Sequence, residues 1–331
     1  MLQLNTKAAP HFHSGDSTQR NMLLVILALL PAWVVSVIGF GWGAIITTII
    51  CVATCVLAEW CITRFMLSQP AHLADLSAAL TGLLLAMNLP ANIPWWMAAL
   101  GALFAIGIGK MVFGGLGQNI FNPALVGRVF MLISFPAAMT TWPVAKGFAT
   151  SYLDAQTAAT PLTLIKSGLA GGEHYELQSY LDAFLSCVPG HIIGGSMGEI
   201  SALMLILGGI LLICTKVITW HIPVAILGTV ACLSAILNAF GIGIDPLTHL
   251  LTGGLMLGAI FMATDYVTSP MTAWGKIIYG IGIGMLVVII RTWGSYPEGM
   301  SFAILIMNGV TPLLNRMRPR RFGEKVKPAK K

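Results

Sequence analysis

Charged residues are scarce in this sequence. Asp, Glu, Lys and Arg together make up 9% of the 331 residues, whereas about a quarter of a soluble domain is charged. Hydrophobic residues make up 56% of the chain, and the mean hydropathy is +0.84. A chain with so few polar residues cannot form a polar surface that shields its apolar residues from water. This composition argues against an ordinary soluble enzyme and predicts a membrane protein.

Several functional motifs are also missing. The six cysteines form no C-x-x-C pair, so no zinc or iron–sulfur site is expected. His11 and His13 form an isolated H-x-H, and two ligands alone make a poor metal site. The stretch GKMVFGGLGQN lacks the spacing of a nucleotide-binding loop. The polar first twenty residues have no A-x-A-like site after them, so no cleavable signal peptide is expected.

The positive charge is concentrated at one end of the chain. The net charge is +6, and eight of the 18 basic residues lie in the last sixteen positions, from Arg316 to Lys331. A basic cluster just after a membrane helix marks the cytoplasmic side and can attract anionic lipid. Nucleic acid is not an expected partner, because no nucleic-acid-binding module accompanies the charge.

Ten apolar runs, separated by Gly, Pro and Asn, predict about ten transmembrane helices. The predicted ranges are 22–40, 43–62, 73–89, 95–113, 123–135, 200–217, 222–240, 247–262, 277–290 and 302–314. The expected fold class is therefore an all-α polytopic membrane protein. The expected organisation is an N-terminal cytoplasmic segment (1–21), a first membrane half (22–136), an external loop (137–199), a second membrane half (200–315) and a basic cytoplasmic tail (316–331).

The two membrane halves resemble each other. LTGLLLAMNLP from Leu80 can be laid beside LTGGLMLGAIFMATD from Leu251. In each copy a Trp-containing break follows, and then a Gly-rich helix that ends in a basic residue, Lys110 or Arg291. The pattern indicates a duplication of five spans. An odd number of spans inverts one copy relative to the other and puts functional sites near the interface between them. The even total places both termini in the cytoplasm.

Residues 154–163, DAQTAATPLT, are a hydrophilic stretch within the external loop. Thr160 before Pro161 is typical of a helix N-cap followed by proline at the first helical position. Asp154 and Thr157 are common turn residues. On this interpretation the stretch is a capped surface helix.

The same stretch matches a pattern used by flavin transferases, in which an acidic residue is followed by S/T-G-A-T. FMN is attached through its phosphate to the final threonine of that pattern. The matching positions here are Asp154, Thr157, Ala158, Ala159 and Thr160, with Ala158 in place of the usual glycine. With this motif between two five-span halves, a basic tail and NPALVGRVF at 122–130, the whole chain resembles the NqrB/RnfD family of redox-complex membrane subunits. The early first span favours the RnfD branch, because NqrB-type chains have a longer N-terminal extension.

The resemblance implies a covalent cofactor and a role in electron transfer. It implies FMN esterified to Thr160, with Asp154, Thr157 and Ala159 completing the attachment motif, and a possible second, non-covalent flavin. A helix N-terminus favours the negative charge of a phosphodiester, so the capping and attachment interpretations are compatible. The family relays electrons between partner subunits that carry iron–sulfur clusters or flavins, and couples this transfer to Na⁺ or H⁺ movement.

The resemblance also implies a flavin transferase as maturation partner and a location in the bacterial inner membrane, with the flavin loop outside. Two alternatives stay open. One is an NqrB-type subunit of Na⁺-pumping NADH:quinone reductase. The other is a non-redox solute channel or transporter with inverted repeats.

Five ionisable residues near the predicted spans are further candidates. Glu59, Asp75, Asp245 and Asp265 lie close to span ends, where they could line an ion route or be ordinary hydrated or paired charges. Arg128 lies inside the short fifth span. It is expected to pair with a carboxylate, to approach the flavin or to extend its charged end to the membrane surface.

Overall fold

The computed structural model describes residues 17–68, 73–143, 147–149, 152, 157–158, 162, 195–241, 245–296 and 298–317. His11, His13 and the basic tail beyond residue 317 lie outside these ranges. Within them the chain is almost wholly helical, which confirms the all-α polytopic membrane fold. Five helices there are long and apolar enough to cross a membrane: Thr18–Phe40, Trp42–Met66, Trp95–Phe113, His221–Ala239 and Ala273–Trp293.

The first half contains α1 (Thr18–Phe40), α2 (Trp42–Cys61, continued by the π-helical turn Ile62–Met66), α3 (Ser77–Met87), α4 (Trp95–Gly107) and α5 (Pro123–Ser134). The second half contains α9 (Ala202–Cys214), α10 (His221–Ala239), α11 (Pro246–Leu251), α12 (Leu255–Leu257), the π-helical turn Gly258–Met262, α13 (Ala273–Trp293) and α14 (Met300–Leu314). The boundaries follow local chemistry. Asn122 and Asp245 each precede a proline and accept hydrogen bonds from the next two free backbone N–H groups.

The packing order repeats between the halves. Helix α2 packs against α3 and α4, and α4 packs against α5; in the second half α10 packs against α11 and α13, and α13 against α14. Helices α1 and α9, which open the two halves, pack against each other. This correspondence is what the duplication predicted from the sequence requires.

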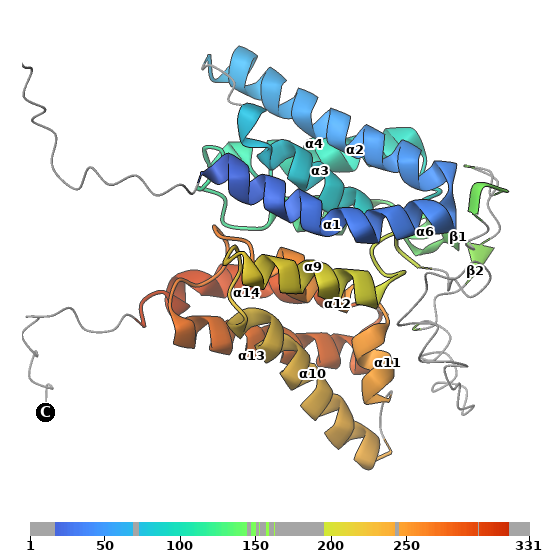
Figure 1. Cartoon of the computed structure of the whole chain (residues 1–331), viewed down its shortest axis with the longest axis vertical. Coiled ribbons are helices and arrows are strands. Elements are labelled where there is room, and N and C mark those ends of the chain that lie inside the picture. Colours follow the sequence, from blue (N-terminus) through green and yellow to red (C-terminus); the bar gives the residue numbers. More distant parts are fainter. Residues whose placement is uncertain are drawn as a thin grey trace, which may run out of the picture.

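Figure 1 shows that α1 begins and α14 ends at one end of the molecule, here called the terminal end. The short strands β1 (Trp142–Pro143) and β2 (Thr157–Ala158) lie with α11 at the opposite end, here called the loop end. Helix α3 begins at the terminal end, since Ser77 lines a pocket with Met22 of α1. Its counterpart α11 begins at the loop end. The two discontinuous helices therefore enter the molecule from opposite ends, as expected for inverted repeats.

Two predicted spans are not continuous helices. The third, predicted at 73–89, contains an α-helix of only 11 residues, which covers about 16 Å, roughly half of a hydrocarbon core of about 30 Å. The eighth, predicted at 247–262, is broken after Leu251, because Gly253 adopts a left-handed conformation with φ +73°. The broken segments meet inside the molecule: the Asn88 amide nitrogen lies 3.3 Å from the Met262 sulfur.

The described parts of the loop between the halves are short. They comprise α6 (Pro136–Thr140), β1, a 3₁₀ turn at Gly147–Ala149, and β2. Strands β1 and β2 are antiparallel, with Trp142 opposite Ala158 and Pro143 opposite Thr157.

Candidate functional site

Of the predicted flavin-attachment motif, the structure describes Thr157 and Ala158, which form β2 at the loop end. Asp154, Ala159 and Thr160 fall outside the described residues. Thr157, expected in a turn, is in strand β2, where its backbone lies opposite Pro143. The neighbouring Ala158 lies opposite Trp142, whose side chain is buried. A buried strand partner therefore fixes the chain just before Ala159 and Thr160.

The segments on both sides of the motif are anchored on the two membrane halves. The Tyr152 hydroxyl donates a hydrogen bond of 2.5 Å to the Ile93 carbonyl, in the break that follows α3. The Leu162 side chain is only 2% exposed and packs against the break of the second half. There, a Cβ added at Gly253 would lie 3.5 Å from Leu162 Cδ2. The motif is thus bracketed by contacts with both broken spans.

Arg291 stabilises the interruption of the helix at Gly253, where Leu162 also packs. Its guanidinium donates to the carbonyls of His249 at 2.6 Å and Thr252 at 3.0 Å, and the residue is 1% exposed. These carbonyls belong to the end of α11, where helical hydrogen bonds stop. A Cβ at Gly253 would lie 2.4 Å from Arg291 Nη2, so only glycine lets the guanidinium approach the chain so closely. Arg291 Nε is buried and has no hydrogen-bond partner among the described residues.

Arg128 lies next to this break and links the two halves. Its Nη1 donates to Asn88 Oδ1 at 2.6 Å, and its Nη2 forms an ion pair with Glu298. A Cβ added at Gly254 would lie 3.4 Å from Nη1. Pairing with a carboxylate, one of the three roles predicted for Arg128, is therefore confirmed.

A second carboxyl group, Glu199, adjoins Glu298 within hydrogen-bonding range. Its chain segment is fixed by the Gly198 N–H, which donates to the Met87 carbonyl at 2.7 Å. Burial, and then the Glu298 carboxylate, raise the pKa of Glu199. Burial opposes ionisation of Glu298 as well, but the Arg128 guanidinium outweighs it and lowers the pKa of Glu298. Sequence reasoning missed both glutamates, because they lie just outside the predicted helices and belong to no motif.

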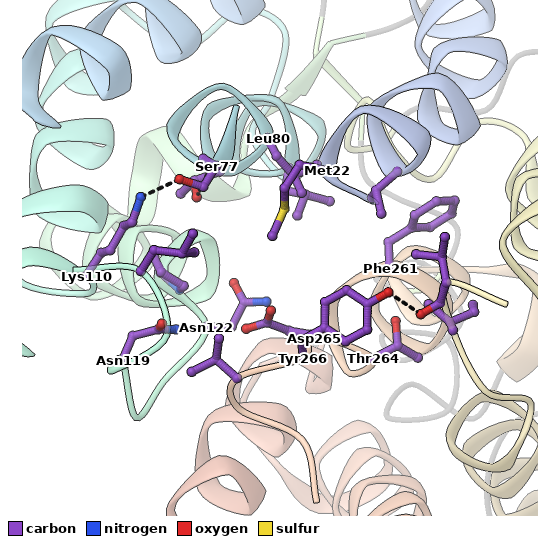
Figure 2. Close-up of a pocket in the computed structure, with 18 of the residues that line it drawn as sticks. Met22, Ser77, Leu80, Lys110, Asn119, Asn122, Phe261, Thr264, Asp265 and Tyr266 are labelled. Carbon is purple, nitrogen blue, oxygen red and sulfur yellow. Dashed lines mark hydrogen bonds between the residues drawn. The ribbon is translucent and has the colours of Figure 1, made fainter. Parts of the chain in front are cut away.

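A pocket opens between the halves at the terminal end (Figure 2). Figure 2 shows Asn122 of the first half and Asp265 of the second half at its centre. Lys110 lines one wall, where its ammonium group donates to Ser77 Oγ at 2.7 Å and to both Glu59 carboxylate oxygens at 2.8 and 2.7 Å. The other walls are mostly apolar side chains from α1, α3 and α9.

The remaining sequence candidates have distinct environments. Asp75 accepts hydrogen bonds from the Ser77 backbone N–H and hydroxyl at the start of α3. Asp245 caps α11 and accepts from the backbone N–H groups of Leu247 and Thr248. Glu59 is buried in its ion pair with Lys110. Asp265 is the member of this set that lines the pocket.

Comparison with known proteins places these features in context. The sequence model of the NQR2, RnfD, RnfE family matches residues 5–323. The chain is 45% identical over 323 residues to the D component of the Na(+)-translocating ferredoxin:NAD(+) oxidoreductase complex of Acetobacterium woodii, covering 97% of this chain and 95% of the relative. It is 44% identical over 326 residues to the D component of the proton-translocating ferredoxin:NAD(+) oxidoreductase complex of Clostridium ljungdahlii, covering 96% and 95%. It is 42% identical over 335 residues to the D component of the ion-translocating oxidoreductase complex of Stutzerimonas stutzeri, covering 93% of each.

Proposed function

Because this chain belongs to the NQR2, RnfD, RnfE family, we propose that it carries FMN on Thr160 and relays electrons within an ion-translocating oxidoreductase complex. Family membership confirms the resemblance predicted from the sequence, and the three relatives named above are all the D component of their complexes. The chain is therefore a multi-pass membrane subunit of such a complex and works with its other subunits. The names of two relatives specify different ions, so the proposal includes Na⁺ or H⁺.

The surroundings of the motif fit a covalently attached flavin. When bound, FMN supplies one- and two-electron redox chemistry, while the protein supplies position and electrostatics. Here Tyr152 and Leu162 hold the flanking chain against the two broken spans. The buried guanidinium of Arg291 and the Leu162 side chain would both lie within 3.5 Å of a Cβ added at Gly253, and Arg291 Nε has no hydrogen-bond partner among the residues that the structure describes. A cation beside the attachment segment favours a phosphodiester and any negative charge on a reduced flavin.

The pocket at the terminal end is our proposed site for a second, non-covalent flavin. Its apolar walls suit a planar ring, and Asn119, Asn122 and Lys110 supply a few polar groups that can orient one. The test is to extract flavin from denatured Thr160→Ala protein. We expect about one flavin per chain, and a marked loss when Asn119→Leu is added. Full retention of the flavin in that double variant contradicts this site.

The attachment proposal is tested by in-gel flavin fluorescence of the denatured protein, co-expressed with a flavin transferase and its partner subunits. We expect fluorescence in the wild type, none in Thr160→Ala, and full signal in the matched control Thr163→Ala. A wild-type chain whose intact mass shows no FMN adduct overturns the proposal. The relatives are named as oxidoreductase components, so the non-redox channel is not put forward.

We further propose that the terminal end faces the cytoplasm, with the flavin loop outside and the basic tail near anionic lipid. The support is the excess of Lys and Arg after α14 and the placement of β1 and β2 at the opposite end (Figure 1). A green fluorescent protein fused to the C-terminus is expected to fluoresce, and alkaline phosphatase fused there is expected to be inactive. The reverse result means that the orientation is inverted.

A further inference from the structure

Four ionisable side chains from distant parts of the sequence lie close together at the loop end. Glu199 precedes α9, Glu298 precedes α14, and Arg128 and Arg291 come from α5 and α13. The Arg128 residue is 5% exposed and the Glu298 side chain 13%. One oxygen of each glutamate, Oε1, is buried and has no hydrogen-bond partner within the described part of the chain. Buried carboxylate oxygens without partners are costly, so this arrangement calls for a ligand.

The charges around the two carboxyl groups differ. Glu298 has its own counter-ion, because Arg128 Nη2 contacts it while Arg128 Nη1 is engaged by Asn88. Within the described ranges, Glu199 accepts a hydrogen bond from the Ser196 backbone N–H at 3.3 Å, and it lies in the field of the Arg128 guanidinium. Two buried carboxylates in hydrogen-bonding range repel each other when both are ionised, and one shared proton removes that repulsion.

In the described part of the chain, Arg291 and, next to it, His249 are further ionisable groups near the pair. Arg291 acts on both glutamates from α13. Behind it His249 lies on α11, with its Nδ1 3.5 Å from Arg291 Nη1. Two nearby guanidinium groups would repel a metal cation, and a sodium ion would need several more oxygen ligands. A proton needs only the two carboxyl oxygens.

We propose that Glu199 and Glu298 form a proton-binding site, loaded with one proton at neutral pH, which exchanges that proton with water at the loop end. In the loaded state the Glu199 carboxyl donates its hydrogen to the Glu298 carboxylate. On release the O–H bond of Glu199 breaks, the proton passes to water, and both carboxylates are balanced by Arg128 and Arg291. No electron is transferred in this step.

The site is placed to respond to the flavin segment. A Cβ added at Gly253 would lie within 3.5 Å of both Leu162 and Arg291, and one added at Gly254 would lie 3.4 Å from Arg128. The chain next to the predicted motif and the arginines of the carboxyl pair therefore approach the same two glycines. Negative charge added in the flavin segment favours retention of the proton, and its removal favours release. This response rests on the proposed function, whereas proton binding by the pair does not.

The test is infrared spectroscopy of the carboxylic-acid C=O stretch, recorded as pH-difference spectra of the complex in lipid nanodiscs. We expect a band at neutral pH that is lost as the pH rises. Glu199→Gln and Glu298→Gln should each remove the band or shift it to lower pH, because either leaves one carboxyl group beside Arg128. Asp245→Asn, which removes a helix-capping carboxylate, should leave it unchanged. Size-exclusion elution reports folding, and the two glutamine variants test the site independently of each other.

Several outcomes overturn the inference. They are a missing band in the wild type, a band unchanged in both glutamine variants, or a band removed by Na⁺ at constant pH, which indicates a metal-cation site. In redox-difference spectra the wild-type band should shift with the flavin state, and an unmoved band overturns the coupling. Thr160→Ala should lose this redox response and keep the pH-dependent band. Failure of flavin attachment is thus distinguishable from failure of proton binding.

Discussion

The Arg128 guanidinium contacts the Glu298 carboxylate across the interface of the two membrane halves, although 170 residues separate them in sequence. The ion pair is buried and lies beside Gly254, close to the chain that flanks the predicted flavin motif. A single arginine therefore joins the C-terminal end of α3, through Asn88, to the loop that precedes α14. Against the effect of burial, the same guanidinium lowers the pKa of Glu298.

Stability should depend on pH through Glu199. Its pKa is raised by burial and by Glu298, so the folded state binds a proton more tightly than the unfolded state. The stabilisation is complete below the ordinary glutamate pKa and is lost as pH rises through the folded-state value. We expect the melting temperature of the wild type to fall as pH rises above about 4.5, the start of this window, and Glu199→Gln to flatten that fall. Identical pH profiles for the two proteins contradict the prediction.

The Lys110–Glu59 pair is buried, so removing one partner should lower the stability of the fold. Both side chains are nearly inaccessible, at 2% and 9% exposure, and the ammonium group also bonds to Ser77 at the start of α3. Lys110→Met leaves a buried carboxylate without a counter-ion, which should lower the unfolding free energy by about 3–5 kcal/mol. Adding Glu59→Gln to this variant should restore much of the loss. Tryptophan fluorescence during thermal unfolding in detergent measures both.

The matched control for that experiment is Lys276→Met. Lys276 donates to the Thr219 hydroxyl at an exposed position, so its removal should change stability by less than about 0.5 kcal/mol. If the two single lysine variants are equally stable, the Lys110–Glu59 pair has no special role. If the double variant is no more stable than Lys110→Met alone, an unpaired Glu59 is not the cause.

The correspondence of Lys110 and Arg291 shows what the sequence could predict. Aligning the repeats matches these two basic residues, and in the structure each ties the end of a long helix to a discontinuous one, through Ser77 of α3 or His249 of α11. The break at Gly253 could not be predicted. Hydropathy averages over an apolar run and gives the same value whether or not the backbone stays helical. The pairing of Glu199 with Glu298 was equally hidden, since it depends on tertiary packing of segments outside the helices.

Gly253 should tolerate no side chain. Its φ of +73° is unfavourable for other residues, and a Cβ would lie 2.4 Å from Arg291 Nη2. Gly253→Ala should lower stability by about 1–3 kcal/mol, because backbone strain is added and the guanidinium is displaced. Gly228→Ala in helix α10 is the opposite case, since nothing lies within 4 Å of its added Cβ. That variant should gain roughly 0.5–1 kcal/mol from higher helix propensity. Equal effects on thermal unfolding would refute the structural role of Gly253.

Tyr152 should affect the mobility of the flavin proposed on Thr160 more than the amount of flavin attached. The hydroxyl bond to Ile93 fixes the chain just before the motif, and a hydrogen bond of this kind contributes about 1 kcal/mol. In Tyr152→Phe we expect full covalent FMN by in-gel fluorescence but a lower steady-state anisotropy of flavin emission. Tyr279→Phe is the matched control, because it removes a hydroxyl bond of similar length, to Asn308 Oδ1, between α13 and α14 and away from the terminal-end pocket. That variant should lose comparable stability and keep wild-type anisotropy. If both variants lower the anisotropy alike, general loosening of the fold explains the effect, and the Tyr152–Ile93 contact does not position the flavin segment.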